Sequence, residues 1–141
     1  MMKWQRFILL LTILLLVVGC GAIDTKAAAP QPTTMEVTRS SVIAQNHLPP
    51  FSRTITDAGA VQRLYTAAQN LPKTRVQRWM CPLPSTIVYH VQFLEGKTVL
   101  QQWNMDAIGC AVVMLHKGDL RRVNSAFVSL FAKTIGLTKL Y

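Results

Sequence analysis

The pattern of hydrophobic and polar positions changes along this chain, and each change predicts a different kind of segment. The first twelve-residue apolar run, Phe7 to Val18, is interrupted only by Thr12. It is too short to cross about 30 Å of hydrocarbon comfortably as a transmembrane helix. From Met35, apolar residues alternate with polar ones, which predicts a strand over about 34 to 44. Residues 51 to 55 are expected to add a short second strand.

Two later segments show helical spacing instead. In the first helix the apolar residues recur three or four positions apart: Val61, Leu64, Tyr65, Ala68 and Leu71. Thr56 or Asp57 is the expected N-cap of this helix, because short polar side chains accept hydrogen bonds from the first free backbone N–H groups. A second helix is expected over about 125 to 135, with Asn124 or Ser125 as its cap and a glycine directly after it.

Between the helices, residues 85 to 116 read as an antiparallel meander with strands over 87 to 94, 98 to 105 and 110 to 116. We expect a three-residue loop at Glu95-Gly96-Lys97, because that register separates the apolar side chains from the polar ones. The face predicted to be buried carries Ile87, Tyr89, Val91, Phe93, Val99, Trp103 and Met105. The third strand is apolar on both faces, so the pattern leaves its register open.

Together these elements predict an α+β fold. Its small antiparallel sheet is expected to combine the three-strand meander with one or two N-terminal strands and to pack against two helices. Residues 34 to 141 are enough for one domain with a small core and hardly enough for two.

The N-terminus resembles the signal peptide of bacterial lipoproteins. Lys3 and Arg6 precede the apolar run, and Val17-Val18-Gly19-Cys20 follows it, similar to a lipobox apart from Val17 where leucine is commonest. The resemblance covers about the first 20 residues. It implies that residues 1–19 are removed and that Cys20 is lipidated. Residues 20–33, rich in alanine and proline, would then be a tether, and residues 34–141 an extracytoplasmic domain.

This resemblance places the protein in the cell envelope. The lipid on Cys20 would hold it at the outer side of the cytoplasmic membrane, or at the outer membrane if the cell has one. The alternatives are an ordinary cleaved signal with an incidental cysteine, and an uncleaved anchor.

Two further cysteines remain if Cys20 carries lipid. Export would place Cys81 and Cys110 in an oxidising compartment, where a pair tends to form a disulfide. The 28 residues between them favour a structural bridge over a redox-active pair; two buried thiols are the alternative. The plan from Cys81-Pro82 through Tyr89-x-Val91-x-Phe93 to Gly109-Cys110 also resembles that of uncharacterised exported lipoproteins.

The chain is strongly basic, with a formal net charge of +9. Cations gather in two runs, which would form one patch for an anionic partner if they met in space. The patch residues are Lys73, Arg75, Arg78, Lys117, Arg121 and Arg122. A solvated cationic surface without a partner is the alternative. Nucleic acid is not the expected partner, because aromatic residues are not interleaved with these charges.

Candidate catalytic groups are sparse. The three histidines are His47 beside two prolines, His90 on the polar face of a strand and His116 at a strand end. None has a partner at metal-ligand spacing, and no known nucleophile or phosphate-loop motif is present. We therefore expect no catalytic residues, no metal and no cofactor.

The function expected from the sequence is that of a non-enzymatic binding module for a protein or an anionic envelope component. One alternative is a small envelope hydrolase or wall-polymer modifier that uses His90 or His116. Another is a small protein inhibitor or envelope assembly factor, by analogy of size and class alone.

Overall fold

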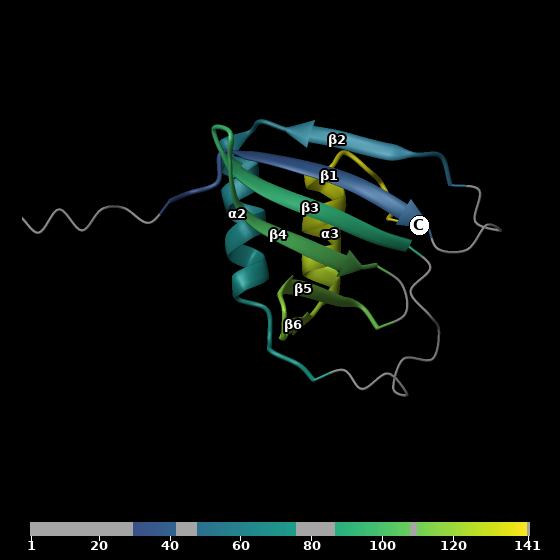
Figure 1. Cartoon of the computed structure of the whole chain (residues 1–141). Helices are drawn as coiled ribbons and strands as arrows, with labels where there is room; N and C mark the ends of the chain where they lie inside the picture. The colour runs from purple at the N-terminus through teal and green to yellow at the C-terminus, as the bar shows by residue number, and fades with distance from the viewer. Residues whose placement is uncertain (1–29, 42–47, 76–86, 108–109, 141) are drawn as a thin grey trace, which may run out of the picture.

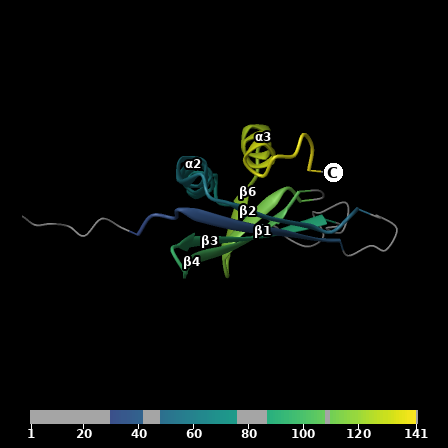
Figure 2. The same cartoon turned by 90° about the horizontal axis from the view of Figure 1, so that it is seen from above.

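The computed structural model describes residues 30–41, 48–75, 87–107 and 110–140. In these residues six strands form one antiparallel sheet in the order β2-β1-β3-β4-β5-β6, and two helices cover one of its faces (Figures 1 and 2). The elements are β1 (Thr34–Ser41), β2 (Phe51–Ile55), α2 (Ala58–Gln69), β3 (Ile87–Glu95), β4 (Thr98–Asp106), β5 (Val112–His116), β6 (Asp119–Arg122) and α3 (Ser125–Thr134). The predicted α+β class is confirmed. No helix among the described residues is both long and apolar enough to cross a membrane.

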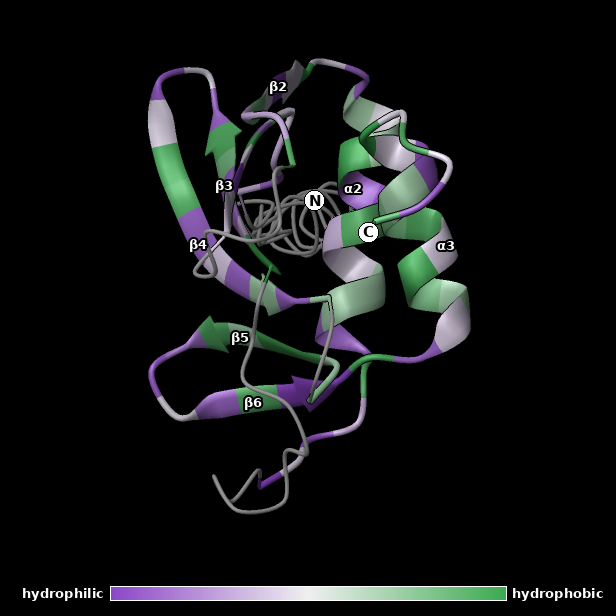
Figure 3. Ribbon diagram, turned by 90° about the vertical axis from the view of Figure 1, so that its right-hand side faces the viewer, coloured by the Kyte–Doolittle hydropathy of each residue, from purple (hydrophilic) through white to green (hydrophobic). Residues whose placement is uncertain are grey.

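The core lies between the sheet and the helices, and β3 crosses its middle. The alternation predicted for β3 is confirmed, because Tyr89 and Phe93 are fully buried while His90 between them is exposed. Figure 3 shows hydrophobic residues where the two layers meet. The C-terminal tail closes one end of the core, since the Tyr89 hydroxyl donates a 2.7 Å hydrogen bond to the buried Leu140 carbonyl.

Both helices begin at caps that the sequence predicts. The Asp57 carboxylate accepts a 3.0 Å hydrogen bond from the Ala60 amide, and the Asn124 side chain accepts one of 2.8 Å from the Phe127 amide. Each bond pairs a backbone N–H that has no partner within the helix. The predicted helix starts are therefore confirmed.

The hairpin between β3 and β4 differs from the prediction. Glu95 pairs with Thr98 across a two-residue turn, and a bulge then shifts the register between Phe93 and Leu94. The bulge restores the predicted faces deeper in the sheet, but it leaves Val99 with 43% of its surface exposed. The expected three-residue loop and the burial of Val99 are wrong, because one extra residue beside the turn reverses which face the following side chain takes.

The strand count expected from the sequence is also too low. The meander continues through a turn at Lys117-Gly118 into β6, where Gly118 has the positive φ of 87° that favours glycine. β5 begins at Val112 rather than at residue 110, and Ala111 before it has a positive φ of 47°. The register of β5, which the pattern left open, buries Val113 and exposes Met114.

Of the three cysteines, only Cys110 is among the described residues. Cys110 is disulfide-bonded, whereas Cys81 and Cys20, the predicted lipidation residue, lie outside the described residues. The Cys81–Cys110 pairing therefore stays a prediction. Residues 1–19, predicted to be a signal peptide, and residues 20–29 of the predicted tether also lie outside the described residues.

Candidate functional site

The segment that follows α2 lies along the free edge of β6. The Arg122 amide donates a 2.9 Å hydrogen bond to the Pro72 carbonyl, and the Thr74 amide donates one of 2.9 Å to the Leu120 carbonyl. Between these bonds, Lys73 pairs with Arg121 in an isolated antiparallel bridge. The segment thus covers a sheet edge that would otherwise present unpaired backbone groups, and it brings the first basic run beside the second.

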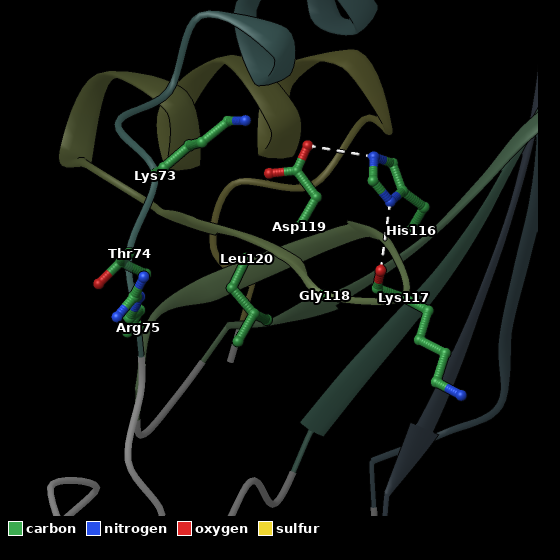
Figure 4. Close-up of a pocket in the computed structure, with 8 residues that line it drawn as sticks. All are labelled: Lys73, Thr74, Arg75, His116, Lys117, Gly118, Asp119 and Leu120. Carbon is green, nitrogen blue, oxygen red and sulfur yellow. Dashed lines mark hydrogen bonds and ion pairs between the residues drawn. The ribbon is translucent and has the colours of Figure 1, made fainter.

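The two runs meet around a pocket of about 500 Å³. Lys73 and Arg75 lie on one side of it, His116 and Lys117 lie on the other, and Asp119 lies between them (Figure 4). We call this the basic pocket. It is built on a hairpin turn and a backbone-paired segment, so its cations come from chain regions more than 40 residues apart in sequence.

Asp119 is the one carboxylate that lines the basic pocket, and Arg121 neutralises it. The Arg121 Nε donates to one Asp119 oxygen at 2.7 Å and its Nη2 donates to the other at 3.0 Å, in the two-pronged geometry that guanidinium favours. Within the described residues no ion pair is formed by Lys73, Arg75 or Lys117. Arg121, and not one of these three cations, is therefore the partner that binds the Asp119 carboxylate directly.

The Arg121 hydrogen bond is the largest of the causes that hold the pKa of Asp119 below its usual value. Burial opposes this shift, and the positive charges of Arg121, Lys73 and His116 add to it. Because the folded pKa is lowered, the ionised carboxylate stabilises the fold above its unfolded pKa of about 3.9. That stabilisation is lost as the pH falls through this value toward the folded pKa.

Asp119→Asn is expected to be less stable than the natural chain at pH 6 to 8, and the gap should close as the pH falls below about 4. Urea unfolding followed by circular dichroism at several pH values measures it. Asp57→Asn is the control, because asparagine is as good an N-cap as aspartate. If the difference in unfolding free energy between Asp119→Asn and the natural chain stays constant down to pH 3, the Asp119 charge does not stabilise the fold.

The predicted patch holds only in part. Lys73, Arg75 and Lys117 line the pocket, whereas the Arg121 side chain is 13% exposed and also donates to the Gln69 and Leu71 carbonyls at 3.1 and 2.9 Å. Arg121 therefore joins β6 to the end of α2, and its place in a ligand-binding patch stays a prediction. Arg122 is exposed but lies outside the pocket lining, and Arg78 lies outside the described residues.

Two pocket residues have functions that sequence reasoning missed. Thr74 contributes to the lining, and Asp119 positions the arginine. Residues two apart in a strand share one face, so Asp119 and Arg121 would have indicated this pair if 119–122 had been recognised as a strand.

A second cluster lies on the sheet face that the helices leave uncovered. His90 on β3 lies between Ser40 on β1 and Asn104 on β4, with 2.9 Å from its Nε2 to the Ser40 hydroxyl and 2.8 Å from its Nδ1 to the Asn104 side-chain oxygen. Sequence reasoning placed His90 on the polar face of a strand but did not foresee these two hydrogen-bond contacts. This order of hydroxyl, imidazole and amide is the order of a nucleophile, its base and an orienting group.

His116 has a different neighbour, since its Nε2 lies 3.3 Å from an Asp119 oxygen. Its side chain is 68% exposed, and the carboxylate is already held by the arginine. Among the residues that the structure describes, no group of three His, Cys, Asp or Glu side chains could hold a metal ion.

Comparison of the chain with protein-family models, with curated proteins and with solved structures finds no match.

Proposed function

We propose that this protein is a lipid-anchored, extracytoplasmic binding module whose basic pocket takes an anionic group of an envelope component. The observation that carries the proposal is the meeting of two distant basic runs around one pocket. The lipobox-like sequence at Val17 to Cys20 supports the location, and no catalytic step is assigned to the pocket.

The chemistry of the pocket favours phosphate or carboxylate ligands. Lys73 and Lys117 supply ammonium charges, and Arg75 supplies a planar guanidinium that binds two oxygens at once. The Thr74 hydroxyl is a further donor at the wall. On the outer side of a membrane, anionic polymers and lipid headgroups carry such groups at high density.

The triple variant Lys73→Gln, Arg75→Gln, Lys117→Gln tests the pocket. Each cation near an anionic ligand contributes about 1 kcal/mol, so we expect roughly 100-fold weaker binding of a soluble polyphosphate. Isothermal titration calorimetry at about 0.1 M salt measures it.

The matched control removes three exposed cations elsewhere, as Arg63→Gln, Lys133→Gln, Lys139→Gln. Both triple variants have the same net charge, so general attraction of a polyanion to a basic protein affects them equally. Equal losses of binding in the two would show that the pocket contributes nothing specific.

The location has its own test. Mass spectrometry of the chain isolated from its natural membrane should find an N-terminal cysteine at position 20 that carries acyl groups. An unmodified Cys20, or a chain that still begins at Met1, would exclude the lipid anchor but not the anion-binding pocket.

A hydrolase is the second candidate, favoured by the contacts of His90 with Ser40 and Asn104. Two observations count against it. The cluster lies on an exposed sheet face, and β3, which carries His90, is paired on both sides, so its amides are engaged in the ladder rather than free to stabilise an oxyanion. The pocket described for this structure has none of these three residues in its lining.

A fluorophosphonate, which reacts covalently with activated serines, separates the two candidates. Labelling of Ser40 that disappears in His90→Ala would support the hydrolase. Absence of labelling under conditions that modify a known serine hydrolase would exclude Ser40 as an activated nucleophile.

A further inference from the structure

We infer that the anionic group in the basic pocket is the phosphate of a lipid headgroup in the same membrane that anchors the chain. This inference rests on the proposed function and names its ligand. The domain would then contact the bilayer directly through its own side chains, in addition to the lipid anchor on Cys20.

The proposed tether is too short to let the domain move far from the membrane. Thirteen residues, 21 to 33, separate the lipidation residue from β1. Even if fully extended, thirteen residues span at most about 45 Å. The domain therefore stays beside the bilayer, where headgroup phosphates have a high effective concentration that a dilute soluble anion does not match.

The direction of the strands places the start of β1 and two turns toward the same end of the sheet. Thr34 pairs with Leu94, so β1 begins where β3 ends. Because the sheet is antiparallel throughout, β4 also begins and β5 also ends toward that end of the sheet. Three features thus lie toward the same end of the strands: the start of β1, where the tether joins the sheet, the β3–β4 turn and the β5–β6 turn.

The two turns carry side chains that suit a membrane surface. We call them the docking turns and define them as residues 95–99 and 116–119. Figure 3 shows both turns projecting on the side of the sheet opposite the helices. The first carries exposed Lys97 beside Val99, which is 43% exposed. The second carries exposed Lys117, which also contributes to the lining of the pocket. A cation beside an exposed aliphatic side chain suits the boundary between headgroups and acyl chains.

The docking turns carry two acidic residues, and one of them is already bound by an arginine. Glu95 on the first turn is exposed, and Asp119 on the second is bound by Arg121. Lys73 and Arg75 add their charges from the pocket wall. An anionic membrane surface therefore meets a net positive face, and docking should weaken as salt concentration rises.

Amide hydrogen exchange on the lipidated chain, reconstituted into vesicles, tests the inference. In vesicles of phosphatidylglycerol, amides of the docking turns should exchange several-fold more slowly than in vesicles of phosphatidylcholine. Exchange in the β2 edge and in α3 should not differ between the two lipids. The same exchange rates in both lipids would overturn the inference.

A pair of variants sharpens this test. Lys97→Gln, Lys117→Gln should lower the ratio of docked to undocked domain about 25-fold, at roughly five-fold for each cation near the surface. Lys133→Gln, Lys139→Gln has the same net charge and should leave the ratio unchanged. Equal effects of the two pairs would also overturn the inference.

Inorganic phosphate added to the phosphatidylcholine vesicles separates the two sources of the ligand. Protection of residues 73–75 and 116–120 by free phosphate, with no effect of phosphatidylglycerol, would leave the proposed function standing and exclude the headgroup. Protection by phosphatidylglycerol in the presence of that phosphate supports the headgroup.

Discussion

Trp103→Ala is expected to lower the free energy of unfolding by about 3 to 5 kcal/mol, the usual cost of removing a large buried aromatic side chain. Trp103 is 2% exposed. Its ring lies 4.1 Å from that of Phe93 and stacks on Tyr65 at 5.9 Å between centroids. Truncation would leave a cavity at the contact between β3, β4 and α2. Urea unfolding monitored by far-ultraviolet circular dichroism measures the loss.

Val99→Ala is the matched control for this prediction. Both side chains belong to β4, and a hairpin without the bulge would place them on one face. Because Val99 is 43% exposed, its truncation should cost less than about 0.5 kcal/mol. A cost for Val99→Ala as large as that for Trp103→Ala would contradict the register of the β3–β4 hairpin.

Loss of the predicted disulfide should destabilise the domain by roughly 3 to 4 kcal/mol. A bridge between Cys81 and Cys110 closes a loop of about 30 residues, and opening it restores conformational entropy to the unfolded chain. Cys81→Ser and Cys110→Ser should each show this loss, and the double variant should be no worse than either single one. Thermal unfolding with and without reductant gives an independent measure.

Cys20→Ser is the control, since it removes the proposed lipidation residue without touching the bridge. Its unfolding free energy should equal that of the parent chain. Alkylation of both Cys81 and Cys110 in the native, unreduced protein would show that no such bridge exists.

Local patterns predicted the elements whose signals are contained in a short stretch of sequence. Alternation identified β1 and β3, and the caps at Asp57 and Asn124 identified both helix starts. These features need only neighbouring residues to be recognised, so tertiary context does not change them. The buried face of β3 followed for the same reason.

Features that depend on pairing between distant segments were missed. β6 is four residues long and reads Asp-Leu-Arg-Arg, so it has no apolar alternation, and its place at the sheet edge depends on Gly118 and on β5. The backbone pairing of Lys73 with Arg121 joins segments whose contact no local spacing reveals.

The candidate site combines residues that local sequence patterns marked with contacts that those patterns could not reveal. The sequence marked the cations and left open whether the two runs meet, and the structure brings Lys73, Arg75 and Lys117 together. The Arg121 guanidinium has few donors left for a ligand, because it already binds a carboxylate and two carbonyls. Charge counts alone could not separate a binding arginine from a structural one.

The most direct test of the basic pocket is a titration of the domain with inorganic pyrophosphate, followed by two-dimensional NMR of the backbone amides. The account predicts saturable shifts that centre on residues 73–75 and 116–120 and that disappear in the Lys73→Gln, Arg75→Gln, Lys117→Gln variant. Shifts that do not saturate, or that centre on Lys133 and Lys139 at the far end of the domain, would contradict it.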